Sequence, residues 1–159
     1  MKMKLGMIIV FNYFEKANLI DFFIKKLKRV KHVQFCLVNN NNDEETLEIL
    51  SEIAEQCKNT SVINISKSKS NTSAVRAGAR YMSRHFNLKH IGFITDLHDQ
   101  EILNIIEELT KNQNEVLIQI NKDQNSKTVR QTFFQRLFSI TDCLNNLRLS
   151  QENAQQTIN

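Results

Sequence analysis

Five apolar segments without polar alternation are the feature of this sequence that most restricts its fold. They span residues 5–11, 33–38, 61–65, 90–95 and 115–120. Strands of a parallel sheet are buried on both faces, so they read as continuous apolar runs, whereas a sheet with one wet face shows alternation. The five segments therefore predict a mainly parallel β-sheet.

Amphipathic patterns typical of helices separate these segments, at residues 18–29, 42–57, 73–85 and 100–112. The first ends in lysines and an arginine, which suit a helix C-terminus. The second opens with Asp43, Glu44 and Glu45, which resembles a capping box. Strands that alternate with helices predict a βαβ-repeating α/β domain with helices on both faces of the sheet.

The end of the chain carries an apolar stripe of its own. Side chains recur at intervals of four and three at Phe133, Leu137, Ile140, Leu144 and Leu147. We divide the chain into a domain over 1–127, a short amphipathic C-terminal helix over 128–148 and a polar tail over 149–159. Three alternatives would cover the stripe: the chain's own sheet, a second copy in a homodimer, or a membrane surface. The headgroup contacts in the last case would come from Lys127, Arg130 and Arg136.

Composition excludes several classes of protein. Only three glycines occur, and none belongs to a phosphate-binding fingerprint, which excludes a Walker loop or dinucleotide motif. The three cysteines are widely spaced without a Cys-x-x-Cys pair, which favours a reducing cytoplasm over a disulfide framework. The net charge of +4 comes without a dense basic stripe, so no nucleic-acid partner is expected. No segment approaches the roughly 20 apolar residues of a membrane span, so membrane contact would be peripheral, at the inner face.

Ligands of parallel α/β sheets bind beyond the carboxyl ends of the strands, near the point where strand order reverses. These exits are residues 11–15, 39–44, 66–73 and 96–99. The last one places Asp96, His98 and Asp99 directly after a buried strand. Carboxylate oxygens suit Mg²⁺ and Mn²⁺, and Mn²⁺ also accepts imidazole. In the alternative interpretation, Asp99 caps the following helix and His98 is only solvated.

The four exits carry motifs in a fixed order. Residues 10–19 read VFNYFEKANL, 38–50 read VNNNNDEETLEIL, 70–78 read SNTSAVRAG, and 94–99 read ITDLHD. These resemble the motifs V-P-T-Y-N-E-x-E-N-L, V-D-D-G-S-T-D-G-T-L-E-I-L, A-x-N-x-G and L-D-A-D-D of family-two glycosyltransferases. The resemblance extends over residues 5–100, and asparagine stands where the family's second motif begins with aspartates.

The resemblance implies a GT-A or Rossmann-like fold and transfer of a sugar from a nucleotide-diphosphate sugar, with the uridine type favoured, to an unknown acceptor. It implies that Asp96 and His98 hold Mn²⁺ or Mg²⁺ on the diphosphate, with Asp-x-His in place of Asp-x-Asp. The nucleotide contacts that it implies are Tyr13, Glu15, Asn39, Arg76 and Asp96. Two of these residues have alternative interpretations: Tyr13 could line the edge of the core, and Arg76 could be a solvated surface residue.

No residue is assigned as the catalytic base that would deprotonate the acceptor. Residues 128–147 resemble a stretch with spaced arginines in polyprenyl-phosphate glycosyltransferases, so we expect a donor-binding half that is either truncated or naturally short. Two functions follow: a glycosyltransferase or its donor-binding fragment, and a non-catalytic GT-A-like module for binding or assembly. A flavodoxin-like regulatory domain is a third alternative, which leaves the sequence at 96–99 unexplained.

Overall fold

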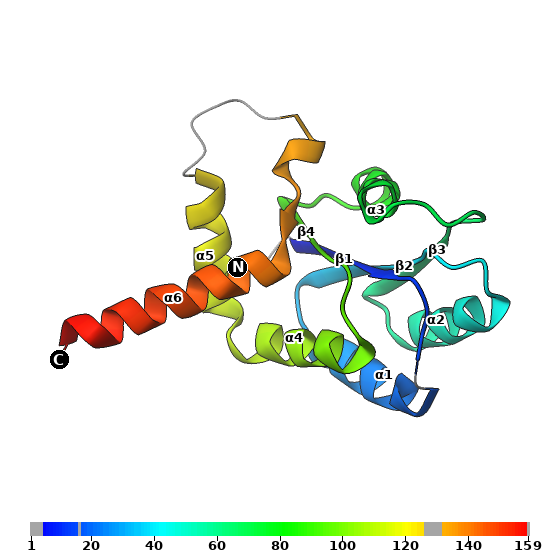
Figure 1. The fold of residues 1–159 in the computed structure, drawn as a ribbon, viewed down its shortest axis with the longest axis horizontal. Helices are drawn as coiled ribbons and strands as arrows, with labels where there is room; N and C mark the ends of the chain where they lie inside the picture. Colours follow the sequence, from blue (N-terminus) through cyan, green and yellow to red (C-terminus); the bar gives the residue numbers. More distant parts are fainter. Residues whose placement is uncertain (1–4, 16, 126–131, 159) are drawn as a thin grey trace.

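The computed structural model describes residues 5–15, 17–125 and 132–158, which form a layered α/β fold (Figure 1). Its centre is a parallel sheet of five strands in the order β3-β2-β1-β4-β5. The strands are β1 (Leu5–Phe11), β2 (Val33–Asn39), β3 (Thr60–Asn64), β4 (His90–Ile94) and β5 (Phe138–Ser139). The predicted α/β class with a mainly parallel sheet is confirmed, and the strand order is Rossmann-like.

Strand β1 lies at the centre of the sheet, and all seven of its residues are buried. It pairs with β2 on one side and β4 on the other, so that Ile9 lies opposite both Leu37 and Ile94. Successive side chains point to opposite faces, and Ile8 and Ile9 therefore belong to two different clusters of buried apolar side chains. Burial on both faces explains why the run has no polar alternation.

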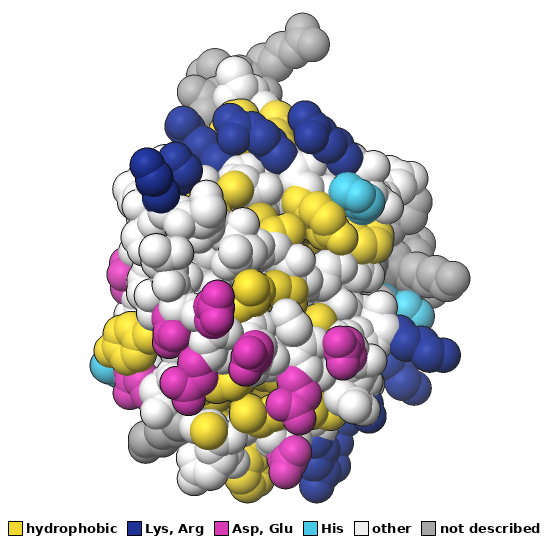
Figure 2. Space-filling view, turned by 90° about the vertical axis from the view of Figure 1, so that its right-hand side faces the viewer, with side chains coloured by type: hydrophobic (Ala, Val, Ile, Leu, Met, Phe, Trp, Pro, Cys, Tyr) yellow, Lys and Arg dark blue, Asp and Glu magenta, His cyan; other side chains and the backbone are white. Residues whose placement is uncertain are grey.

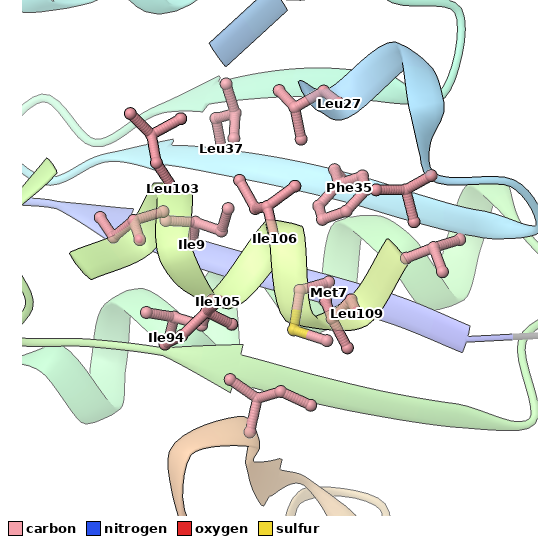
Figure 3. Close-up of a cluster of buried hydrophobic side chains, with 14 of the residues drawn as sticks. Met7, Ile9, Leu27, Phe35, Leu37, Ile94, Leu103, Ile105, Ile106 and Leu109 are labelled. Atoms are coloured by element: carbon pink, nitrogen blue, oxygen red, sulfur yellow. The ribbon is translucent and has the colours of Figure 1, made fainter. Parts of the chain in front are cut away.

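Helices cover both faces of the sheet. Helices α1 (Ile20–Arg29), α2 (Glu44–Gln56) and α4 (Asp99–Lys111) lie below the sheet in Figure 1, and α3 (Asn71–His85) lies above it. The short 3-10 turn η1 (Ala17–Leu19) precedes α1. Figure 3 shows Leu103 and Ile106 of α4 among Ile9, Phe35 and Leu37 of the sheet. These contacts form the larger of the two apolar clusters.

The strand predicted at 115–120 is wrong, because this segment lies within helix α5 (Gln113–Asn125). Val116, Gln119 and Ile120 are buried on one helical face, whereas Ile118 is 67% exposed. Apolar residues predominate in this segment, but the buried positions are separated by three and four residues, which is the period of a helix. Short apolar runs are ambiguous between strand and helix, and here the polar flanking residues continue the helix.

The single helix predicted over 128–148 is also wrong in its bounds. Phe134–Arg136 forms the 3-10 turn η2, Phe138–Ser139 is β5, and helix α6 runs over Ile140–Ile158 through most of the predicted tail. Strand β5 lies beside β4 at Gly92, where an added Cβ would come within 2.9 Å of the Phe138 ring. The glycine thus makes room for the ring, and the chain enters the sheet where a helix was expected.

The apolar stripe of α6 packs inside the chain. Ile140, Leu144 and Leu147 are buried in the same cluster as β1 and α4, which confirms the first of the three predicted alternatives for these residues. A homodimer or a membrane contact would have to use other side chains, and both stay predictions. Lys127 and Arg130 lie outside the described residues, and Arg136 is exposed. No helix in the described part of the chain has the length and apolar content needed to cross a membrane.

Candidate functional site

The strand order reverses between β1 and β4. The chain runs from β1 through β2 to β3 on one side, and α3 then returns it to β4 on the other side of β1. Residues that follow β1 and β4 line a cleft of about 210 Å³ at this point, among them Tyr13, Glu15, Asp96 and His98. We call it the switch-point cleft. It is where ligands of open parallel sheets bind.

Glu15 connects the two strand exits. Its Oε1 lies 2.6 Å from Nδ1 of His98, and its backbone N–H donates to Oδ2 of Asp99 over 2.9 Å. Asp99 is 4% exposed and is the first residue of α4, whereas His98 is the N-cap, so the alternative in which Asp99 caps the helix is wrong. The loops after β1 and β4 are therefore held against each other before any ligand arrives.

Glu15 also changes the acid–base behaviour of its neighbours. The hydrogen bond to Glu15 and then its negative charge raise the pKa of His98 above the ordinary value of 6.5. The same two causes raise the pKa of Tyr13, whose side chain is hydrogen-bonded to Glu15. A carboxylate favours the protonated form of each partner, so imidazolium is more populated here than in a free histidine.

We expect Glu15→Gln to lower the pKa of His98 toward 6.5, because the variant keeps the size of the side chain and removes its charge. A raised folded-state pKa stabilises the fold below the unfolded value, and this contribution is lost as pH rises through the folded value. Proton NMR titration of the His98 imidazole measures the titration midpoint in the folded wild type and in the folded variant. The same midpoint in wild type and variant would contradict the pairing.

Three asparagines hold Asp96 in place. Asn40 Nδ2 donates to Asn12 Oδ1 over 3.1 Å, Asn12 Nδ2 donates to Asn71 Oδ1 over 3.4 Å, and Asn71 Nδ2 donates to Asp96 Oδ1 over 2.7 Å. We call this chain of hydrogen bonds the asparagine relay. Asp96 has a φ of 59°, a left-handed conformation that aspartate tolerates better than most residues. The relay crosses the ends of β2, β1 and β4 and orients the carboxylate.

Asn39 lies inside the sheet and not in the cleft. It is 1% exposed, its Nδ2 donates to Asn64 Oδ1 over 2.9 Å, and its Oδ1 accepts from the Asn41 N–H over 3.2 Å. The residue is paired with Asn64 in the register of β2 and β3. Its predicted contact with the nucleotide stays a prediction, and the observed contacts give it a structural role.

We expect Asn39→Asp to lower the free energy of unfolding by about 1–3 kcal/mol, the cost of an unsatisfied or mismatched buried polar group. The substitution keeps the shape but replaces the buried amide donor with a carboxylate that faces Asn64. Urea denaturation of both proteins measures the difference. Unchanged or increased stability would mean that this side chain is not buried as described.

Arg76 also lies away from the switch-point cleft. It is exposed on α3, and its guanidinium carbon is 5.3 Å from the centre of the Phe134 ring. Of the predicted nucleotide contacts, the structure brings Tyr13, Glu15 and Asp96 together, with His98 beside them. Sequence reasoning missed the asparagine relay, whose only signal was the presence of asparagine just after β1 and β2.

The cleft offers two candidate metal ligands but no complete metal centre. Within the described residues, no group of three or more His, Cys, Asp or Glu side chains could hold a metal ion. Mg²⁺ is commonly bound by one or two carboxylates, with phosphate oxygens and water as the other ligands. Asp96 and His98 thus fit a cation that arrives with a diphosphate better than a permanent protein-only centre.

Comparison with known proteins identifies no family. No protein-family model matches this chain, and no curated protein matches it. The resemblance of the strand exits to family-two glycosyltransferases therefore stays a prediction.

Proposed function

We propose that this chain binds a nucleotide-diphosphate sugar, of the uridine type, in the switch-point cleft, as the donor-binding part of a glycosyltransferase. The supporting observation is the convergence of Tyr13, Glu15, Asp96 and His98 on one cleft where the strand order reverses. These side chains come from two exits about 80 residues apart in the sequence, and Glu15 joins them through His98 and Asp99. The proposal assigns them one common ligand.

Each of the four side chains has a role in this proposal. The ring of Tyr13, which is 55% exposed, offers a flat surface on which a base stacks. Glu15 would accept a hydrogen bond from the base or the ribose. Asp96 and the Nε2 of His98 would hold the cation, and His98 would have to lose its proton when the metal binds, because only neutral imidazole is a metal ligand. When bound, Mn²⁺ or Mg²⁺ neutralises charge on the diphosphate leaving group.

Titration calorimetry with uridine diphosphate glucose tests the proposal. We expect binding in the presence of Mn²⁺, loss of binding with EDTA, and binding weaker by about tenfold or more in Asp96→Asn, because the charged ligand is removed. Asparagine keeps the acceptor for Asn71 and tolerates the left-handed conformation, so the thermal midpoint should be unchanged. Asp21→Asn, an exposed site on α1, is the matched control. Equal binding by wild type and Asp96→Asn would contradict the metal role.

A non-catalytic binding or assembly module is the second candidate function. Both candidate metal ligands already have partners in the chain, since Asp96 accepts from Asn71 and His98 pairs with Glu15. Polar groups satisfied in this way also suit a site that has only a structural role. Calorimetric silence of the wild type toward a panel of nucleotide sugars, with and without Mn²⁺, would favour this function over sugar transfer.

A further inference from the structure

A second cavity lies on the α3 face of the sheet, between α3, β4 and the turn η2. Its volume is about 190 Å³, below the range of about 300–1,000 Å³ that drug-sized ligands occupy. The apolar part of its lining comes from Val75, Phe93, Phe134 and Leu137. We call it the α3 cavity. It is large enough for a ring-sized group.

The polar lining of the α3 cavity includes three side chains that can donate hydrogen bonds to a ligand. Arg76 contributes a guanidinium, and Thr72 and Thr95 contribute hydroxyl groups. The guanidinium carbons of Arg76 and Arg80 lie 5.3 and 5.2 Å from the centre of the Phe134 ring, within the range of a cation–π contact. An arginine stacked on an aromatic ring keeps its planar N–H groups free to form paired hydrogen bonds to an anion.

The charge around the α3 cavity favours an anion. Helix α3 carries Arg76, Arg80 and Arg84 and no acidic residue, whereas α2 on the other face carries five glutamates and no basic residue. Figure 2 shows a row of Lys and Arg side chains along the top, on the α3 side, and Asp and Glu side chains in the lower half, with a second group of Lys and Arg at the lower right. Among the residues that the structure describes, none of these three arginines takes part in an ion pair.

Asn71 separates this cavity from the switch-point cleft. Its side chain lines the α3 cavity and donates to Asp96, which lines the cleft. The cleft carries the carboxylates of Glu15 and Asp96, and the α3 cavity carries the guanidinium of Arg76. An anionic ligand that comes without a cation is therefore attracted to the cavity and repelled by the cleft.

We propose that the α3 cavity binds a phosphate monoester with a small apolar or aromatic group. Arg76, Thr72 and Thr95 hold the phosphate, and Phe93, Phe134 and Leu137 contact the organic part. Three donor side chains match the three terminal oxygens of a phosphate monoester better than the two oxygens of a carboxylate. This ligand is distinct from the nucleotide sugar and its site does not depend on a metal, so the proposal goes beyond the function proposed above.

Calorimetric titration with phenyl phosphate, in EDTA and without nucleotide, tests this site. We expect the wild type to bind, Arg76→Met to bind about tenfold more weakly or worse, and Arg84→Met to bind within about twofold of the wild type. Both variants remove one positive charge from α3. Arg84 is the control because it is exposed on the same helix and does not line the cavity. Phe134→Leu should weaken binding of phenyl phosphate more than binding of inorganic phosphate, because the ring contacts the organic group as well as Arg76. Thermal midpoints check that each variant is folded.

Three results would overturn the proposal: no binding of phenyl phosphate by the wild type, equal losses in Arg76→Met and Arg84→Met, or binding of benzoate as tight as that of phenyl phosphate. The first result would show that the cavity does not bind this ligand. The second would show that only general charge attraction acts, and the third would show that the site does not select a phosphate group. Vesicles of phosphatidylcholine with phosphatidic acid then distinguish the source of the ester. Arg76-dependent vesicle binding assigns it to a lipid headgroup, and its absence assigns it to a soluble metabolite.

Discussion

Replacing Phe35 with alanine should lower the free energy of unfolding by about 3–5 kcal/mol, a large share of the 5–15 kcal/mol typical of a domain. Phe35 is fully buried in β2 opposite Met7 of β1, and its ring lies among the side chains of α1 and α4 (Figure 3). Alanine would leave a cavity that the neighbouring strands cannot fill, because both of their faces are already packed. Urea denaturation with a two-state fit measures the loss.

Phe22→Ala is the matched control for this prediction. Phe22 lies on α1 and is 54% exposed, so the same change in side chain should alter stability by about 0.5 kcal/mol or less. Comparable losses from the two substitutions would contradict the burial of Phe35 in β2 and the exposure of Phe22 on α1.

Leu144→Ala should lower the free energy of unfolding by about 2–5 kcal/mol. Leu144 is 1% exposed and packs in the cluster that contains β1 and α4, although it stands on the last helix of the chain. Because the contact lies within one chain, the loss should not depend on protein concentration. Chemical denaturation at two concentrations, a hundredfold apart, makes this measurement.

Leu149→Ala on the same helix is the control. Leu149 is 57% exposed, and its truncation should change stability little. A loss in Leu144→Ala that disappears at high protein concentration, together with a fall in sedimentation mass, would show instead that a second copy covers this face of α6. That result would favour the predicted homodimer over packing on the chain's own sheet.

The sheet was predictable where burial alone determines the pattern of the residues. Strand β1 is covered on both faces, so its seven residues show no alternation, and the same reasoning identified β2 and β4. It failed at 115–120, where six mostly apolar residues fit a strand as well as a helix. It failed again near Phe138, because the entry of β5 into the sheet depends on space at Gly92, a residue 46 positions earlier.

The candidate site was predictable in part, for a geometric reason. Parallel strands end at the same edge of the sheet, and β1 and β4 are neighbours in it, so the residues that follow them lie close together and Glu15 contacts His98. The asparagine relay could not be predicted, since it depends on the orientation of amide groups from the exits of β1 and β2 and from the first residue of α3. Asn39 and Asn40 are neighbours in the sequence, but the Asn39 side chain bonds to Asn64 in the sheet, whereas the Asn40 side chain bonds to Asn12 in the relay. The sequence does not indicate this difference.

Paramagnetic broadening by Mn²⁺ in amide NMR spectra tests the central claim most directly. With uridine diphosphate glucose present, substoichiometric Mn²⁺ should first remove the signals of Tyr13, Leu97 and His98, while signals from α5 and the outer part of α6 persist. In Asp96→Asn the same additions should leave these signals in place. Broadening centred elsewhere, or unchanged by Asp96→Asn, would contradict the account of a cation and diphosphate bound in the switch-point cleft.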